Sequence, residues 1–365
     1  MKKAPHLLVC ISGHGFGHLA QVAPVLNALH GLSPNIRLTV RSTIPQPLLR
    51  QRIRPEFNHL QEATDFGMVM VSALEVDVAA SMHAYKAFHA DWSGNVRAEA
   101  ARLQAIGADL VLTDVAYLPL AAANQIGLPA LSLCSLNWAD IFAHYCAGMA
   151  GAAGIQQQIE AAYGSANCFL RPTPAMPMPW LERSVAIGLL ADVGQSRRSE
   201  IDRELELTQE DRLILVSMGG IPTRFPVRQW PRLRHVKWLV QKDWLAEEPR
   251  EDMLAFEPLG MPFADLLASC DLLLTKPGYG AFAEAAASGI PVLFVMRDDW
   301  PEQPYLVDWL TQAGPCQGID IAQVADGDFA TEVLALLQTP KSTPLMVDGN
   351  EQAARYLQAQ LSAVT

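Results

Sequence analysis

The stretch Leu272-Leu-Leu-Thr-Lys-Pro-Gly-Tyr-Gly-Ala-Phe-Ala-Glu284 places a buried strand, a glycine turn and the start of a helix in direct succession. Backbone N–H groups at such a helix start can hold a phosphate, because they lack intrahelical acceptors and lie at the positive end of the helix dipole. We expect the turn around Gly278, with the amides of Tyr279, Gly280 and Ala281, to bind phosphate in this way. We expect Glu284, about one turn into the helix, to accept hydrogen bonds from ribose hydroxyls.

A second glycine-rich turn, Gly13-His-Gly-Phe-Gly-His18, follows the strand predicted at the N-terminus and opens another helix. Two such turns, one in each half, predict two nucleotide-fold domains that face each other across a cleft. The glycines lie at alternate positions and so do not match the Gly-x-Gly-x-x-Gly spacing of dinucleotide sites. No acidic residue ends the second strand, where residues 40–42 are Val-Arg-Ser. The sequence therefore disfavours NAD.

The turn also presents two imidazoles, His14 and His18, and histidine suits a general base near neutral pH. One of the two could instead cap or pack the turn. A metal site is the weaker interpretation, because a glycine-rich turn is not a helix and no third ligand is apparent. Asp114 ends a predicted strand of the same half, where it could orient a histidine or contact an acceptor.

Two further segments of the second half point to the same ligand. The turn Ser217-Met-Gly-Gly220 could let backbone approach a diphosphate, with Thr223 or Arg224 as a polar partner, or it could be an ordinary turn. The segment Arg297–Gln303 follows a predicted strand and carries acids and an amide, which suit the hydroxyls of a sugar, although a charged surface loop would look similar. The candidate donor-binding residues from these segments are Gly219, Gly220, Asp298, Asp299, Glu302 and Gln303.

Apolar strands alternate with helices in both halves, which is typical of α/β domains with parallel sheets covered on both faces. The 365 residues are too many for one ordinary core. A proline-rich segment at 171–179 cannot be regular helix or central strand, so the crossing between domains should lie near it. We expect an N-terminal acceptor-side domain over 1–180 and a C-terminal donor domain over 181–345. A terminal helix in 346–365 could pack back on the first domain.

The amino-acid composition narrows the range of expected binding partners. The formal net charge of −11 argues against nucleic acid and gives no bulk attraction to an anionic membrane. A local basic stretch at 224–242 is either a solvated helix face or a landing site for phosphates such as lipid head groups, which leaves peripheral membrane contact open. The cysteines show no Cys-x-x-Cys pair, and no run of about 20 apolar residues occurs. These features predict a reduced, cytoplasmic protein without a signal peptide or a membrane span.

Together these motifs resemble the GT-B glycosyltransferases, especially family 28, which includes the N-acetylglucosaminyltransferase that forms lipid II. The first turn of that family reads Gly-Gly-x-Gly-Gly-His, and its histidine matches His18. The donor motif of the family has a glycine turn and a glutamate six residues later, which is the spacing of Gly278 and Glu284. Its two adjacent glutamines correspond to Gln303 and Pro304, so the second is replaced and the sugar is not defined. The chain also resembles the glycosyltransferase-like N-terminal region of plant L-arabinokinase, in the turn at 13–18 and in the segment 297–305.

The resemblance implies a transferase that moves a hexosyl or N-acetylhexosaminyl group from a nucleotide-diphosphate sugar, UDP-linked, to an unknown hydroxyl acceptor. It implies inversion at the anomeric carbon, with His18 as the base, and neither a metal nor a cofactor. Two alternatives stay open. One is a GT-B-fold UDP-sugar epimerase, which needs no acceptor but uses further acidic residues. The other is a non-catalytic module that binds a nucleotide sugar.

Overall fold

The computed structural model describes residues 4–72, 74–220, 225–245, 249–297 and 299–364, and it divides into two compact units. The first unit contains the chain up to Leu190, except for residues 72–75, and takes in the C-terminal segment from Val347. The second unit contains residues 72–75 and Ala191–Met346. The change of unit therefore falls ten residues beyond the boundary expected at 180, and the C-terminal helix lies in the first unit.

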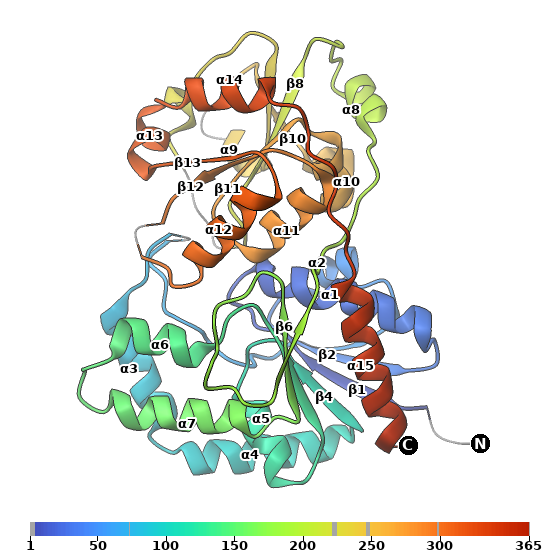
Figure 1. Cartoon of the computed structure of the whole chain (residues 1–365), viewed down its shortest axis with the longest axis vertical. Helices are drawn as coiled ribbons and strands as arrows, with labels where there is room; N and C mark the ends of the chain where they lie inside the picture. The colour runs from blue at the N-terminus through green and yellow to red at the C-terminus, as the bar shows by residue number, and fades with distance from the viewer. Residues whose placement is uncertain (1–3, 73, 221–224, 246–248, 298, 365) are drawn as a thin grey trace. The chain divides into compact units, whose positions relative to one another are not determined.

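The first unit is built on a parallel sheet in the order β3-β2-β1-β4-β5-β6-β7 (Figure 1). Its strands are short apolar runs, and the side chains of β1, β4 and β5 are buried along their whole length, as expected for a sheet covered on both faces. The strands are β1 His6–Cys10, β2 Arg37–Arg41, β3 Asn58–Leu60, β4 Leu110–Thr113, β5 Ala130–Leu133, β6 Cys168–Pro172 and β7 Ser184–Ile187.

Helices cover this sheet, and α1 packs along α15, so the two ends of the chain meet within one unit (Figure 1). The Gln358 side chain of α15 donates hydrogen bonds to the Leu32 carbonyl and the Ser33 hydroxyl, which fixes the helix there. The helices are α1 Phe16–Leu32, α2 Gln46–Arg52, α3 Val78–His89, α4 Trp92–Ile106, α5 Leu118–Gln125, α6 Trp138–Cys146, α7 Ala152–Gly164 and α15 Gly349–Val364.

The second unit repeats the plan with a parallel sheet in the order β10-β9-β8-β11-β12-β13. Its core includes the buried rings of Trp230, Trp238 and Phe329, together with Leu74 from the short segment at 72–75. Its strands are β8 Arg212–Ser217, β9 Val236–Val240, β10 Met253–Ala255, β11 Leu272–Thr275, β12 Val292–Val295 and β13 Cys316–Ile319. Its helices are α8 Arg198–Glu204, α9 Lys242–Leu245, α10 Phe263–Ser269, α11 Tyr279–Ser288, α12 Gln303–Ala313, α13 Ile321–Asp326 and α14 Ala330–Gln338, with 3₁₀ turns at Val227–Gln229 and Glu257–Leu259.

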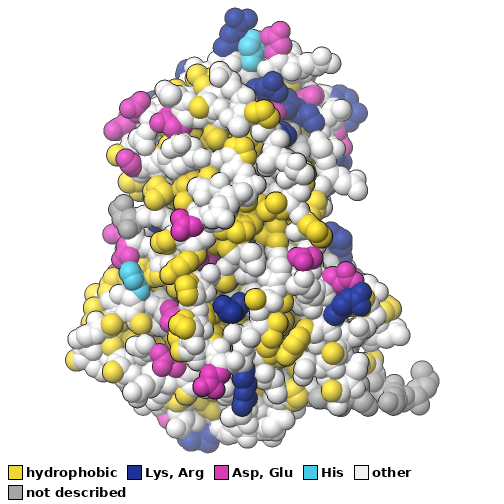
Figure 2. Space-filling view, in the orientation of Figure 1, with side chains coloured by type: hydrophobic (Ala, Val, Ile, Leu, Met, Phe, Trp, Pro, Cys, Tyr) yellow, Lys and Arg dark blue, Asp and Glu magenta, His cyan; other side chains and the backbone are white. Residues whose placement is uncertain are grey.

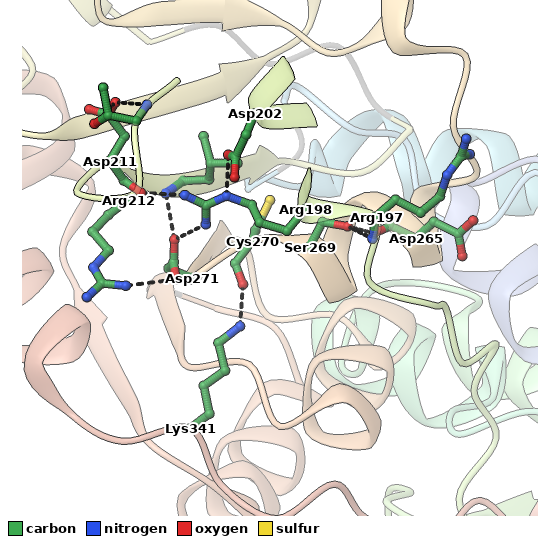
Figure 3. A network of polar contacts seen from close by, with 12 residues as sticks. Arg197, Arg198, Asp202, Asp211, Arg212, Asp265, Ser269, Cys270, Asp271 and Lys341 are labelled. Carbon is green, nitrogen blue, oxygen red and sulfur yellow. Dashed lines mark hydrogen bonds and ion pairs between the residues drawn. The ribbon is translucent and has the colours of Figure 1, made fainter. Parts of the chain in front are cut away.

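A network of ion pairs and hydrogen bonds lies at the amino ends of the central strands β8 and β11 (Figure 3). Arg198 of α8 pairs with Asp271, whose carboxylate also accepts the Leu213 amide. Lys341 donates to the Cys270 carbonyl, which holds the segment after α14 on the same edge. The charged groups and hydrogen-bonding groups at these amino ends are paired with one another, so we assign them a structural role. Ligands are expected at the opposite, carboxyl ends of the strands.

The proline-rich segment does not carry the crossing between the units. Arg171 and Pro172 belong to β6, which pairs with β5 and β7 and is therefore a central strand, contrary to the expectation. Pro172 is tolerated because it lies beyond the residues of β6 that pair with β5 and has a partner on β7 alone, as on an edge strand. The residues after it connect β6 to β7 within the first unit.

The basic stretch at 224–242 is not a helix face. Its described members lie on a 3₁₀ turn, a loop, strand β9 and the start of α9, and Arg224 lies outside the described residues. His235 beside Arg234 pairs with Glu210. Figure 2 shows basic, histidine and acidic side chains grouped together at the top of the view. Among the helices that the structure describes, none combines the length and the apolar character needed to cross a bilayer.

Candidate functional site

The predicted site residues gather at the carboxyl ends of the strands in both units. Chain order reverses between β1 and β4 in the first sheet and between β8 and β11 in the second. In open parallel sheets, ligands bind outside the carboxyl ends of the strands at such a reversal. The turn at 13–18 follows β1 and Asp114 follows β4, whereas the turn at 217–220 follows β8 and the segment 275–284 follows β11. Each unit thus has a candidate site where this rule places one.

In the first unit the structure brings His18 and Asp114 together. The His18 Nδ1 atom lies 3.1 Å from Asp114 Oδ2, and both side chains are buried. The helix α1 begins at Phe16, within the predicted glycine turn, so His18 is part of its first turn. Two backbone amides fix the Asp114 carboxylate. Its Oδ2 atom accepts a hydrogen bond from the Ser12 amide, and its Oδ1 atom accepts one from the Val115 amide. The carboxylate is therefore positioned by β1 and β4 and presented to one nitrogen of the imidazole.

The environment of His18 makes its imidazole a strong base. Burial acts to lower the pKa of His18, but the charge of Asp114 and the contact with it outweigh burial and raise the pKa well above 6.5. A carboxylate beside Nδ1 favours the tautomer that leaves Nε2 as the acceptor, and it stabilises the imidazolium that forms when Nε2 takes a proton. This pair can therefore remove a proton from a hydroxyl group.

His14 is held in a different way. Its Nε2 atom lies 3.1 Å from the Met68 carbonyl, its amide donates to the Ser12 hydroxyl, and its ring packs edge-on against Trp138. A ring nitrogen that donates to a carbonyl cannot also accept a proton from a substrate. Only Nδ1 of a neutral His14 could then act as a base, whereas the Asp114 carboxylate beside His18 Nδ1 leaves Nε2 of that ring for a substrate.

Two residues of this site were not predicted, Asp65 and Trp138. The Trp138 indole donates to Asp65 Oδ2 at 2.6 Å, and its ring lies against both histidines. Burial and the neighbouring Asp114 raise the pKa of Asp65 to about 6. Gly67 has a positive φ of 63°, and a Cβ there would lie within 3 Å of the His14 and Trp138 rings, so this glycine makes room for the cluster. The segment 43–100 gave no readable signal for Asp65, because its role depends on contacts distant in sequence.

In the second unit, α11 begins at Tyr279 with Gly278 as its N-cap, as the opening stretch predicts. Within the described residues no side chain caps this end of the helix, and its first turn contains the amides of Tyr279, Gly280 and Ala281. Glu284 is the sixth residue of the helix, farther in than expected, and only 1% of its surface is exposed. A ribose contact at Glu284 would therefore lie at the base of the site.

The turn after β8 lies beside the start of α11. The Thr275 hydroxyl donates to the Ser217 carbonyl at 2.6 Å, which ties the ends of β8 and β11 together. Gly219 adopts a φ of 81°, a conformation that favours glycine, and Gly220 follows it. Thr223 and Arg224, expected as polar partners, lie outside the described residues.

The segment 297–303 is folded on itself. Gln303 accepts the Arg297 amide at 2.9 Å and donates to the Arg297 carbonyl at 3.0 Å, so its side chain closes the loop. Glu302 is buried and lies 3.3 Å from the Trp300 indole nitrogen. Asp299 is exposed, and Asp298 lies outside the described residues. Among these predicted sugar ligands, only Asp299 has a described side chain that is open to solvent.

The second-unit site also contains two cations that were not predicted, Lys276 and Arg297. Both follow strands at the site, β11 and β12, and both belong to segments that the sequence singled out for other residues. Across the described part of the chain, no group of three or more His, Cys, Asp or Glu side chains is arranged to hold a metal ion.

Comparisons with known proteins define the class of fold to which the two units belong. No protein-family model matches the chain. It is 26% identical to L-arabinokinase of Arabidopsis thaliana over 309 residues, which are 82% of this chain but 29% of the arabinokinase. A UDP-glucosyltransferase from Polygonum tinctorium capable of glucosylating indoxyl has a similar structure, with a TM-score of 0.57, 14% identity and coverage of 98% and 99% of the two chains. A UDP-N-acetylglucosamine 2-epimerase gives a TM-score of 0.56, 16% identity and coverage of 98% and 95%.

The fold that these similarities define is that of the GT-B glycosyltransferases, with two Rossmann-like α/β domains, each built on a parallel sheet. The predicted fold class is thereby confirmed, while the facing arrangement of the domains and membership of family 28 stay predictions. At these identities, structural similarity establishes the fold alone, and activity has to be argued from the residues of the site.

Proposed function

We propose that this protein is a glycosyltransferase that moves a sugar from a UDP-linked donor to a hydroxyl acceptor, with inversion and without a metal ion. The observation that carries the proposal is the buried pair of His18 and Asp114 at the carboxyl ends of β1 and β4. The structural neighbours named above support the choice of donor, since one is a UDP-glucosyltransferase and the other acts on UDP-N-acetylglucosamine. Whether this chain transfers a hexosyl or an N-acetylhexosaminyl group is left open by the site.

The second unit supplies the donor site of this proposal. The diphosphate binds at the start of α11, where the amides of Tyr279, Gly280 and Ala281 donate to its oxygens, and the turn at Gly219 and Gly220 lets backbone approach from the side of β8. Glu284 binds the ribose. Asp299 is the described acidic side chain best exposed to reach the sugar, whereas Glu302 and Gln303 hold the loop that carries it.

The chemical step follows from the base. The acceptor oxygen attacks the anomeric carbon while the bond from that carbon to the diphosphate breaks, and His18 Nε2 takes the hydroxyl proton. Attack opposite the leaving group inverts the configuration. The helix start and the nearby cations offset the negative charge that accumulates on the departing diphosphate, which is why the reaction needs no metal.

Location and partners follow from the same proposal. The cysteines are free, and all but Cys316 are buried, which fits a cytoplasmic protein. The acceptor is a small molecule, a glycan or a lipid-linked group. The mixed charges around Arg234 and His235 give no support to a dedicated lipid-binding face in that stretch.

The direct test is a thermal-shift screen of the protein against nucleotide sugars, followed by an assay that couples release of UDP to transfer onto a panel of phenols and sugars. A ligand that binds the native state alone raises the melting temperature. We expect UDP-sugars to stabilise the protein and UDP release to depend on both an acceptor and His18. Stabilisation without turnover of any donor would instead support a sensing module of the kind that the arabinokinase similarity allows.

A UDP-sugar epimerase is the second candidate, and one observation favours it. Asp65 adds a carboxyl group, with a pKa of about 6, to the cluster that contains His18 and Asp114. A group of that pKa can exchange protons near neutrality, as an isomerase that needs further acids requires. Incubating UDP-sugars in D₂O without an acceptor decides between the two, because epimerisation would incorporate deuterium into the sugar ring and transfer would not.

A further inference from the structure

The first unit carries an open groove whose lining contains none of the residues assigned above to the candidate sites. The groove lies on α5, α7 and the start of α4, and it has a volume of about 450 Å³. α5 packs against both α4 and α7, and the three helices can be followed in Figure 1. A volume of this size is typical of sites for small ligands.

The sequence of α7 explains why a groove forms here. Gly154, Gln157, Gln158 and Ala161 recur at spacings of three and four residues, so they share one face of the helix. A helix face that packs into a core carries large apolar residues at these spacings, whereas this face carries two amides and two small residues. Gly154, Gln157 and Ala161 are exposed. This face of α7 is therefore accessible to a ligand along the groove.

Trp92, the first residue of α4, forms one wall of the groove. Its indole stacks on the His89 ring, with the ring centres 4.9 Å apart and the planes 14° from parallel. The ring of Tyr117 also stacks on His89. These contacts hold the indole in one position, while the Trp92 side chain stays partly exposed. A platform that is already ordered loses little conformational entropy when a ligand binds to it.

A chain of hydrogen bonds orients one of the amides. The Gln158 Oε1 atom lies 2.7 Å from His89 Nδ1, and the Tyr117 hydroxyl lies 2.8 Å from His89 Nε2. An amide oxygen can only accept, so Nδ1 donates to Gln158 and Nε2 accepts from Tyr117. Burial lowers the pKa of His89, which keeps the ring neutral and the chain in this direction. The Gln158 oxygen is thereby occupied, and its NH₂ group remains as a donor for a ligand.

The chemistry of the lining limits the class of ligand. None of the lining side chains that the structure describes is charged, so the groove offers an anion such as phosphate no ion pair. A wholly apolar ligand would cover the amides without pairing them. A sugar meets both limits, because the faces of its ring carry C–H groups that pack on an indole and its edges carry hydroxyl groups that pair with amides. The polar and aromatic side chains of the lining are Trp92, Asn124, Gln157, Gln158 and Ser165.

We propose that this groove binds a neutral saccharide. Trp92 supports one sugar ring, and the amides of Gln157, Gln158 and Asn124 pair with its hydroxyl groups and with those of the next ring. Gln158 and Ser165 are separated along α7 by about 10 Å, which leaves room for a disaccharide. The inference does not depend on the proposed function, because no residue of the groove belongs to the base site or to the donor site.

The probes are the neutral disaccharides maltose, cellobiose and lactose, offered at millimolar concentration to the whole chain. Saturation-transfer difference NMR detects binding, and titration gives the dissociation constant. The variants are Trp92→Ala, which removes the platform, and Gln157→Ala, which removes an exposed amide from a helix position that tolerates alanine. Gln156→Ala is the matched control, because Gln156 lies on the same helix, donates to Glu160 and is not part of the lining. His18→Ala tests whether the sugar binds at the base site instead.

We expect the wild type to bind at least one of the three disaccharides. Trp92→Ala should weaken this binding about tenfold or more, and Gln157→Ala about three- to tenfold, since each removes a direct contact with the sugar. Gln156→Ala and His18→Ala should match the wild type.

Two results would overturn the proposal outright. One is a wild type that binds none of the three disaccharides, and the other is equal affinity in the wild type, Trp92→Ala and Gln157→Ala. Binding that is lost in His18→Ala and kept in Trp92→Ala would place the sugar at the base site and would also overturn the groove. If thermal unfolding shows that Trp92→Ala is not folded, the comparison of Gln157→Ala with Gln156→Ala decides the question.

Discussion

Replacing Asp114 with asparagine tests the base directly, because it removes one charge and keeps the shape of the side chain. The charges lie 3.1 Å apart in the pair with His18. At an effective dielectric constant of about 20, this corresponds to an attraction of about 5 kcal/mol before burial is counted. Burial of His18 opposes part of it, so the net effect is smaller. A lost general base costs about 10²- to 10⁴-fold in rate, and we expect kcat to fall by about 100- to 1,000-fold.

The pH profile makes this prediction specific. His18 can accept a proton only when it is neutral, so its raised pKa places the acid limb of the wild-type rate above pH 6.5. Without Asp114, burial dominates and lowers the pKa, which moves the limb to lower pH. The ratio of wild-type to variant rates should therefore be smaller at pH 6 than at pH 9.

The measurement is the initial rate of UDP release with a saturating donor between pH 5 and 9.5, and calorimetry with UDP should show unchanged affinity. Asp91→Asn is a matched control, since Asp91 is an exposed N-cap of α4 and asparagine caps helices equally well. Circular dichroism and thermal unfolding establish that the variants are folded. An acid limb at the same pH in both proteins, or equal rates at pH 9, would refute the assignment of the pair.

Three further outcomes are expected. His18→Ala should abolish transfer while UDP still binds, and normal turnover would place the base elsewhere. Glu284→Ala should weaken UDP binding by about tenfold, or about 1.4 kcal/mol, with Glu284→Gln less affected; equal affinities by calorimetry would remove the ribose contact. Addition of EDTA should leave the rate unchanged, because the charge of the leaving group is offset by α11 and the nearby cations, and loss of activity would indicate a metal-dependent mechanism.

The sequence was sufficient for most of the central strands, but not for β6, which ends inside the proline-rich segment that was expected to exclude a central strand. The alternation of apolar strands with helices is found in both units, because buried parallel strands are written as continuous apolar runs. The edge strands β3, β7, β10 and β13 were not predicted. Each has three or four residues and is only partly buried, so none produces the long apolar run of a buried strand.

The site was predictable only where a residue follows a strand or opens a helix. His18 and Asp114 could be identified in this way because β1 and β4 are neighbours in the sheet. The pairing of Trp138 with Asp65 joins residues 73 positions apart, and no local pattern marks it. Lys276 stands within the stretch quoted first, but its surroundings include Gly219 and Arg297, which follow two other strands, so no local pattern marks it.

A crystal structure of the protein with UDP would show directly whether the second unit binds a nucleotide diphosphate where β11 meets α11. We expect phosphate oxygens to accept hydrogen bonds from the amides at residues 279–281. UDP bound at another place, with residues 276–284 in contact with no phosphate, would contradict it.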